Sequence, residues 1–127
     1  MIASTAPDAL VLDGVSCTFG NVKALSGATL HVRAGTVHAL LGENGAGKTT
    51  LMRIAYGMVQ PSSGTIAVNG VVRTLQSPAQ ALSVGIGMVH QHFTLVPAMT
   101  VVENVALGSH GNFSGKAWAR RVRDIGE

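Results

Sequence analysis

The sequence has one cysteine, few charged residues and no long apolar run. Cys17 alone cannot form an internal disulfide, which fits a reducing compartment. Charged residues make up 12% of the chain against a usual share of roughly 25%, so part of the surface is expected to meet other protein. No segment approaches the ~18 apolar residues of a membrane span. The first lysine is Lys23, so we expect no secretory leader and a cytoplasmic protein.

The charges that are present do not form a basic surface of the kind that binds nucleic acid. The 127 residues carry a net charge of +3, from nine Lys and Arg against six Asp and Glu. Residues 1–108 contain five of these cations and four of the anions, so the main body is almost neutral. The excess of cations lies in residues 109–127. A nucleic-acid partner is therefore not expected.

Short apolar runs and turn residues predict six β-strands, and longer periodic stretches predict four helices. Gly20-Asn21 and Asn69-Gly70 read as hairpin connections, and Asn-Gly is a favoured two-residue loop. The predicted strands are 9–19, 24–33, 36–41, 65–68, 71–73 and 85–89, of which 36–41 and 85–89 read as buried. The predicted helices are 48–56, 78–84, 100–107 and 116–127, with N-caps at Ser77 and Thr100. This mixture predicts an α/β fold.

The strongest signal is a glycine-rich segment, Gly42-Glu-Asn-Gly-Ala-Gly-Lys-Thr49, placed between a predicted strand and a predicted helix. It fits G-x-x-x-x-G-K-[ST] completely. Glycines let backbone N–H groups approach phosphate oxygens, and the N-terminus of the following helix is electropositive. A lysine at Lys48 is suited to neutralise the β and γ phosphates, and a hydroxyl at Thr49 to ligate Mg²⁺. Thr50 is placed to reach the α phosphate.

The residues around this loop resemble an ABC transporter ATPase. Phe19-Gly20 precedes the loop, and Pro61-Ser-Ser-Gly64 and Gln91 follow it in the order typical of that family. Residues 77–93, 95–97 and 99–105 resemble the subclass that serves importers of simple sugars and nucleosides. The resemblance covers residues 9–108 and implies a truncated P-loop NTPase core with an N-terminal antiparallel β subdomain.

The resemblance also implies roles for individual residues. Phe19 would stack on adenine, and Gln91 would belong to the Q-loop, which contacts Mg²⁺ and the attacking water. The catalytic residues implied are Lys48 and Gln91, and the metal ligands are Thr49 and Gln91. The nucleotide-binding residues implied are Phe19, Gly42, Asn44, Gly45, Ala46, Gly47, Lys48, Thr49 and Thr50. ATP and Mg²⁺ are the implied ligands. Permease subunits and a second ATPase domain are the implied partners, at the inner face of the cell membrane.

The same resemblance divides the chain and leaves an alternative open. Residues 1–8 would be a tail, 9–108 the N-terminal part of the ATPase domain, and 109–127 the start of its helical subdomain. The signature motif, the Walker B carboxylates and the switch histidine are expected after Glu127. ATP hydrolysis coupled to uptake is the activity implied for an intact relative. The alternative is a catalytically incompetent fragment that binds nucleotide or docks on a permease, and we expect marginal stability for the isolated chain.

Three other patterns have less specific interpretations. His90 and His92 have the spacing of two metal ligands, but no third ligand accompanies them. Trp118, Val122 and Ile125 share one helix face beside basic residues, as in a membrane-surface helix or in the first helix of the expected helical subdomain. A P-loop kinase or GTPase would need an acceptor site or a guanine-reading motif, and neither is present.

Overall fold

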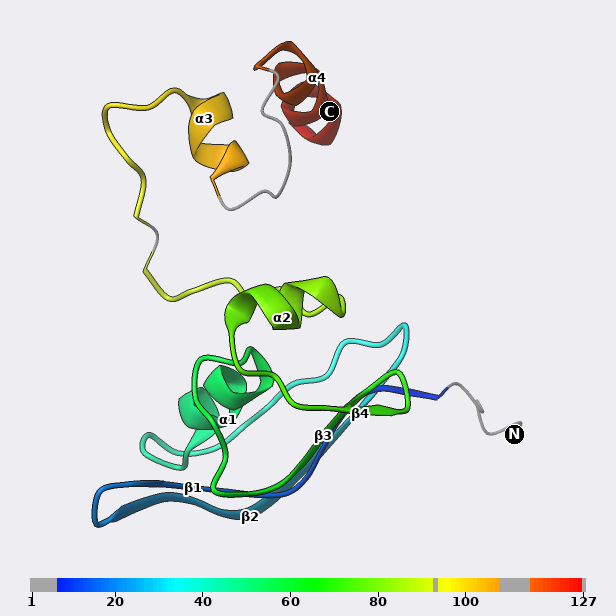
Figure 1. Ribbon diagram of the computed structural model, residues 1–127, viewed down its shortest axis with the longest axis vertical. Helices are drawn as coiled ribbons and strands as arrows, with labels where there is room; N and C mark the ends of the chain where they lie inside the picture. The colour runs from blue at the N-terminus through cyan, green and yellow to red at the C-terminus, as the bar shows by residue number, and fades with distance from the viewer. Residues whose placement is uncertain (1–6, 93, 108–114, 127) are drawn as a thin grey trace. The chain divides into compact units, whose positions relative to one another are not determined.

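The computed structural model describes residues 7–92, 94–107 and 115–126. It divides into two compact units, Met1–Met88 and Val89–Glu127, of which the first contains the sheet (Figure 1). Its elements are β1 (Asp8–Phe19), β2 (Val22–Arg33), α1 (Lys48–Ala55), β3 (Ser63–Val68), β4 (Val71–Arg73) and α2 (Pro78–Ser83). The second unit contains α3 (Val101–Ala106) and α4 (Gly115–Gly126). No helix among the described residues is long and apolar enough to cross a membrane.

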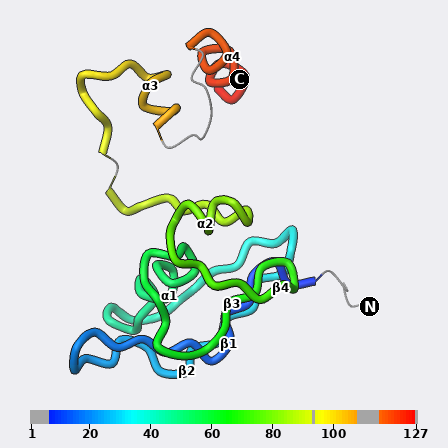
Figure 2. The backbone as a smooth tube through the Cα atoms, in the orientation of Figure 1, coloured from blue at the N-terminus to red at the C-terminus, as the bar shows by residue number. Residues whose placement is uncertain are grey.

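The four strands form one antiparallel sheet in the order β2-β1-β3-β4. Both predicted hairpins are confirmed, and the tube in Figure 2 shows β1 turning back into β2 and β3 into β4. At the second turn Asn69 and Gly70 have φ of 50° and 77°. Two consecutive left-handed residues are the geometry of the type I′ hairpin, which explains the Asn-Gly pair.

The hydrophobic core lies between the sheet and helices α1 and α2. Ile54 of α1 is fully buried and belongs to one cluster with Leu12 and Val15 of β1 and Ala81 of α2. Ser77 caps α2 as predicted, since its hydroxyl accepts a hydrogen bond from the N–H of Gln80 at 3.3 Å. The helices predicted at 48–56 and 78–84 are thus confirmed as α1 and α2. The apolar face of α1 fixes this helix against the sheet.

The two buried strands predicted at 36–41 and 85–89 are wrong. Neither segment is a strand in the structure, and neither joins the four-stranded sheet. Leu41 is 88% exposed and Val89 is 79% exposed. An extended segment without a neighbouring strand leaves its N–H and C=O groups without ladder partners, so apolar sequence alone does not make it a strand.

The second unit contains two helices that contact each other. The predicted capping box of α3 is confirmed: the hydroxyl of Thr100 accepts from the N–H of Glu103, and the Glu103 carboxylate accepts from the N–H of Thr100 at 2.7 Å. These bonds, first the backbone N–H and then the hydroxyl of Thr100, hold the pKa of Glu103 below its usual value. Trp118 of α4 is half-buried and lies beside the Arg121 guanidinium, which is 5.8 Å from its ring centroid.

Candidate phosphate-binding site

The glycine-rich loop is turned rather than extended, and it leads directly into α1. The N–H of Ala46 donates to the carbonyl of Glu43 at 3.2 Å, which closes a turn over Asn44 and Gly45. Gly45 has φ of 84°, a left-handed conformation that such a turn requires and that glycine adopts without strain. The predicted loop and helix are therefore confirmed, whereas the strand expected before them is not.

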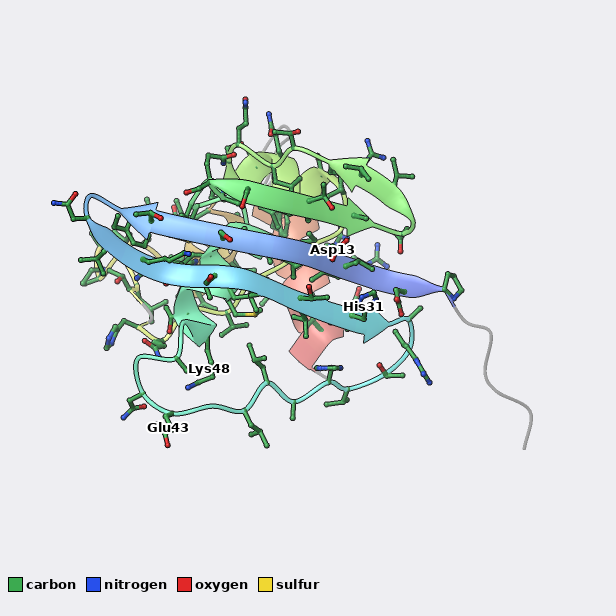
Figure 3. The ribbon with its side chains drawn as sticks, turned by 90° about the horizontal axis from the view of Figure 1, so that it is seen from below. Asp13, His31, Glu43 and Lys48 are labelled. Carbon is green, nitrogen blue, oxygen red and sulfur yellow. The ribbon has the colours of Figure 1, made fainter. Side chains whose placement is uncertain are left out.

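The side chain of Lys48 folds back over the loop that precedes it. Figure 3 labels Lys48 at the start of α1 and Glu43 on this loop. The Lys48 ammonium group donates to the carbonyl oxygens of Gly42 at 2.5 Å and Glu43 at 2.7 Å. No carboxylate within the described residues forms an ion pair with it, although Glu43 is close in sequence. The positive charge of Lys48 is therefore not neutralised and is available to an anion.

The N-terminus of α1 offers hydrogen-bond donors that have no acceptor. No side chain caps the helix, and its first turn contains no acidic residue. The first bond of the helix runs from the N–H of Leu51 to the carbonyl of Gly47 at 2.9 Å. Among the described residues nothing accepts from the N–H groups of residues 48–50. These groups and the helix dipole together favour a negative ligand at this end of α1.

Two glycines of the loop are needed because other atoms lie close to them. Gly47, at φ 90°, is the residue before α1, and a Cβ added to it would lie 2.5 Å from Cδ2 of Leu25. A Cβ at Gly42 would lie 3.4 Å from Cβ of Ala46 and 3.5 Å from Cδ of Lys48. Sequence reasoning did not find Leu25, because it is 22 positions before Gly47 and no local pattern links the two.

The structure places the other predicted site residues in different surroundings. Asn44 and Thr49 are exposed, and Thr50 is half-buried on α1. Phe19 ends β1 with 49% of its surface exposed, so its ring is accessible to a ligand. Gln91 is exposed and belongs to the second unit. The structure thus brings together the loop residues and Lys48, while the roles of Phe19 and Gln91 stay predictions.

No preformed metal centre is present among the described residues, since none of their His, Cys, Asp or Glu side chains gather in groups of three or more. His90 and His92 accordingly are not part of such a group. The acidic residues of β1 have partners: Asp8 pairs with Nδ1 of His31 at 2.8 Å, and Asp13 accepts from the Thr29 hydroxyl at 3.4 Å. Figure 3 shows Asp13 and His31 on the sheet.

Comparison with known proteins gives consistent matches over most of the chain. A profile of the ABC transporter family matches residues 25–125. The arabinose import ATP-binding protein AraG 2 of Burkholderia cenocepacia is 48% identical over 108 residues, which are 84% of this chain and 21% of that protein. The nucleoside import ATP-binding protein NupA of Lactococcus lactis is 50% identical over 95 residues, 75% of this chain and 19% of that protein. A dimeric bacterial ABC transporter cassette matches with a TM-score of 0.74 and 25% identity, over 91% of this chain and 54% of that one.

The Gly42–Thr49 segment, turned by the Ala46–Glu43 bond and leading directly into α1, has the sequence pattern and the loop–helix arrangement of a P-loop nucleotide-binding protein. Within that class, this chain belongs to the ABC transporter family, whose profile covers most of its length. The chain spans about a fifth of the length of the curated relatives it matches.

Proposed function

We propose that the glycine-rich loop and the start of α1, residues 42–50, bind ATP, with the triphosphate at the N-terminus of α1. The observation that carries the proposal is the set of hydrogen-bond donors at one place: the N–H groups of residues 48–50 and the Lys48 ammonium, none of which is paired with a carboxylate of the described residues. A polyanion satisfies all of them at once, whereas water satisfies the N–H groups without using the charge.

Individual residues have separate roles in this proposal. Lys48 would exchange its bonds to loop carbonyls for bonds to the β and γ phosphates, because a phosphate oxygen carries more charge than a carbonyl. Gly42, Asn44, Gly45, Ala46, Gly47 and Thr50 would line the phosphates. Phe19, half-exposed at the end of β1, would stack on the adenine ring.

The hydroxyl of Thr49, at the start of α1, also fits Mg²⁺ bound together with the nucleotide. Mg²⁺ takes few protein ligands when it is bound through phosphates, so a cluster of carboxylates is not required. The exposed hydroxyl of Thr49 and the exposed amide of Gln91 are the ligands that we propose. When bound, Mg²⁺ neutralises charge on the phosphates, and Lys48 and Gln91 would act in hydrolysis beside it.

For the whole protein we propose an ATPase that drives import of a sugar or a nucleoside. Support comes from relatives named as arabinose and nucleoside import ATP-binding proteins, at 48% and 50% identity. Permease subunits would be its partners, at the inner face of the cell membrane. Pairing with a second ATPase domain is supported by the dimeric cassette among the similar structures.

Nucleotide binding is tested by measuring Mg-ATP affinity by calorimetry for wild type, Lys48→Ala and Arg53→Ala. Arg53 lies at the other end of α1 and is exposed, so its replacement removes the same charge away from the loop. Bonds to a charged group are each worth about 1.5–3 kcal/mol, so Lys48→Ala is expected to weaken binding by about 10- to 100-fold. Arg53→Ala is expected to change the affinity little. Equal affinity of wild type and Lys48→Ala would refute the site.

A further inference from the structure

The last glycine of the phosphate loop lies against strand β2. A Cβ at Gly47 would come within 2.5 Å of Cδ2 and 3.3 Å of Cγ of Leu25, and within 2.9 Å of the carbonyl oxygen of Ala24. Real Cβ atoms do not approach other heavy atoms so closely, so the backbone of Gly47 sits as near to β2 as glycine allows. The residue that sets the direction of the first N–H groups of α1 is thus in contact with a strand that is distant in sequence.

Leu25 is itself held firmly in the first unit. It pairs with Cys17 across the β1–β2 ladder and is only 8% exposed. Its side chain belongs to the core cluster that also contains Leu51 and Ile54 of α1. Interiors of this kind are close-packed, so a side chain fixed on several sides has little freedom to move. Gly47 therefore rests on a rigid surface.

The other side of the loop is packed less, since Leu40 is the one residue of 36–41 that is partly buried against the core. The segment that leads into the loop, residues 36–41, is not a strand and lies outside the sheet. The first half of the loop is bonded through the turn from the N–H of Ala46 to the carbonyl of Glu43 and through the Lys48 ammonium, which contacts the carbonyls of Gly42 and Glu43. Lys48 is also the group that we propose for the phosphates. Of the loop glycines, Gly47 makes the tightest approach to another element, and this contact with β2 does not depend on Lys48.

We propose that Leu25 is a positioning residue for phosphate binding, and this inference rests on the nucleotide-binding function proposed above. Leu25 touches no phosphate. It fixes Gly47, and through Gly47 it fixes the direction in which the N–H groups of residues 48–50 point. Donors must be aligned with the ligand before binding for their full hydrogen-bond strength to be realised. A smaller side chain at position 25 leaves the N–H groups of residues 48–50 in place but lets them turn away from the phosphates.

The same strand connects the loop with the predicted adenine platform. Phe19 pairs with Val22 at the hairpin end of β2, and Leu25 lies three residues further along that strand. At about 3.3 Å per residue, Val22, the partner of Phe19, and Leu25 are about 10 Å apart along β2. One rigid hairpin would therefore set the spacing between the base-binding end and the phosphate-binding end of the site.

The test compares Leu25→Ala with Leu12→Ala. Both replacements make the same change in the same core cluster, and Leu12 is fully buried but is not among the atoms nearest to a Cβ at Gly47. Mg-ATP affinity, corrected for the folded fraction, is expected to fall by about 10- to 100-fold in Leu25→Ala, since small misplacements of binding groups cost this much. Leu12→Ala is expected to stay within about twofold of wild type. Leu25→Met, which conserves volume, is expected to restore binding.

A second measurement does not need nucleotide. Hydrogen exchange of the amides of residues 47–50 is expected to be faster in Leu25→Ala than in Leu12→Ala at matched stability. Leu25→Val and Leu12→Val repeat the comparison if the alanine variants do not fold. Equal affinity loss and equal exchange in the two variants would overturn the role of Leu25. Absence of nucleotide binding by wild type, with the exchange difference present, would overturn the proposed function and leave the positioning contact standing.

Discussion

Replacing Gly47 with alanine adds a single methyl group where the phosphate loop meets β2, and the structure allows its effect to be separated into two parts. The first is backbone strain, because Gly47 has φ of 90°, a conformation that disfavours any residue with a Cβ. The second is steric, because the new Cβ would lie 2.5 Å from Cδ2 of Leu25 and 2.9 Å from the carbonyl oxygen of Ala24. The Leu25 side chain can rotate at a cost, but the Ala24 carbonyl moves only if β2 moves.

Gly45→Ala provides the matched control. Gly45 has φ of 84°, nearly the same strain, but a Cβ there would have nothing within 4 Å. Strain in the left-handed region costs about 1–2 kcal/mol, so Gly45→Ala is expected to lower the free energy of unfolding by about that amount. Overpacking adds about 1–3 kcal/mol, so Gly47→Ala is expected to cost about 2–5 kcal/mol. The entropy that alanine removes from the unfolded chain is the same in both and cancels in the comparison.

Urea titration monitored by circular dichroism measures both variants, in a fixed concentration of trimethylamine oxide so that each has a folded baseline. The difference between the two free energies of unfolding is the steric part alone. A difference near zero would show that Gly47 is not pressed against β2 in solution. Both the contact and the positioning role of Leu25 would then be refuted.

Further predictions concern global stability, the loop before α3 and the response to pH. The free energy of unfolding in urea is expected below about 5 kcal/mol, because Val37, Leu41 and Val89 of the two segments 36–41 and 85–89 are exposed. Asn104→Ala is expected to cost about 1–3 kcal/mol locally and to speed amide exchange at Val96, since Asn104 bonds both the N–H and the carbonyl of Val96. Glu103 titrates with a lowered pKa, so its contribution to stability is present above its unfolded pKa and is lost as pH falls through the folded value.

Each of these expectations has a clear contrary result. A cooperative transition well above 5 kcal/mol would show that the exposed apolar segments do not weaken the fold. Unchanged protection of the Val96 amide in Asn104→Ala would mean that the side chain does not hold that loop. For Glu103, an NMR titration midpoint equal to that of an unstructured peptide would contradict the capping box as the cause.

Much of the secondary structure followed from local chemistry in the sequence. Asn69-Gly70 predicts its hairpin because both residues accept positive φ, and Thr100 with Glu103 predicts the start of α3 because the two side chains satisfy each other's backbone. Each of these signals lies within four residues, so distant parts of the chain do not alter it. The loop at 42–49 belongs to the same group, since its glycines and the helix after them determine its turn.

The sequence by itself thus determined the hairpins, the helix caps, the phosphate loop and the likeness to ABC transporter ATPases. Only the tertiary structure decided whether 36–41 and 85–89 are strands, because a strand exists through hydrogen bonds to a neighbour that is often distant in the chain. It also decided which side chain fixes Gly47. Leu25 is an ordinary apolar residue of a strand, and its importance comes from the atom that it touches, which no periodicity or motif encodes.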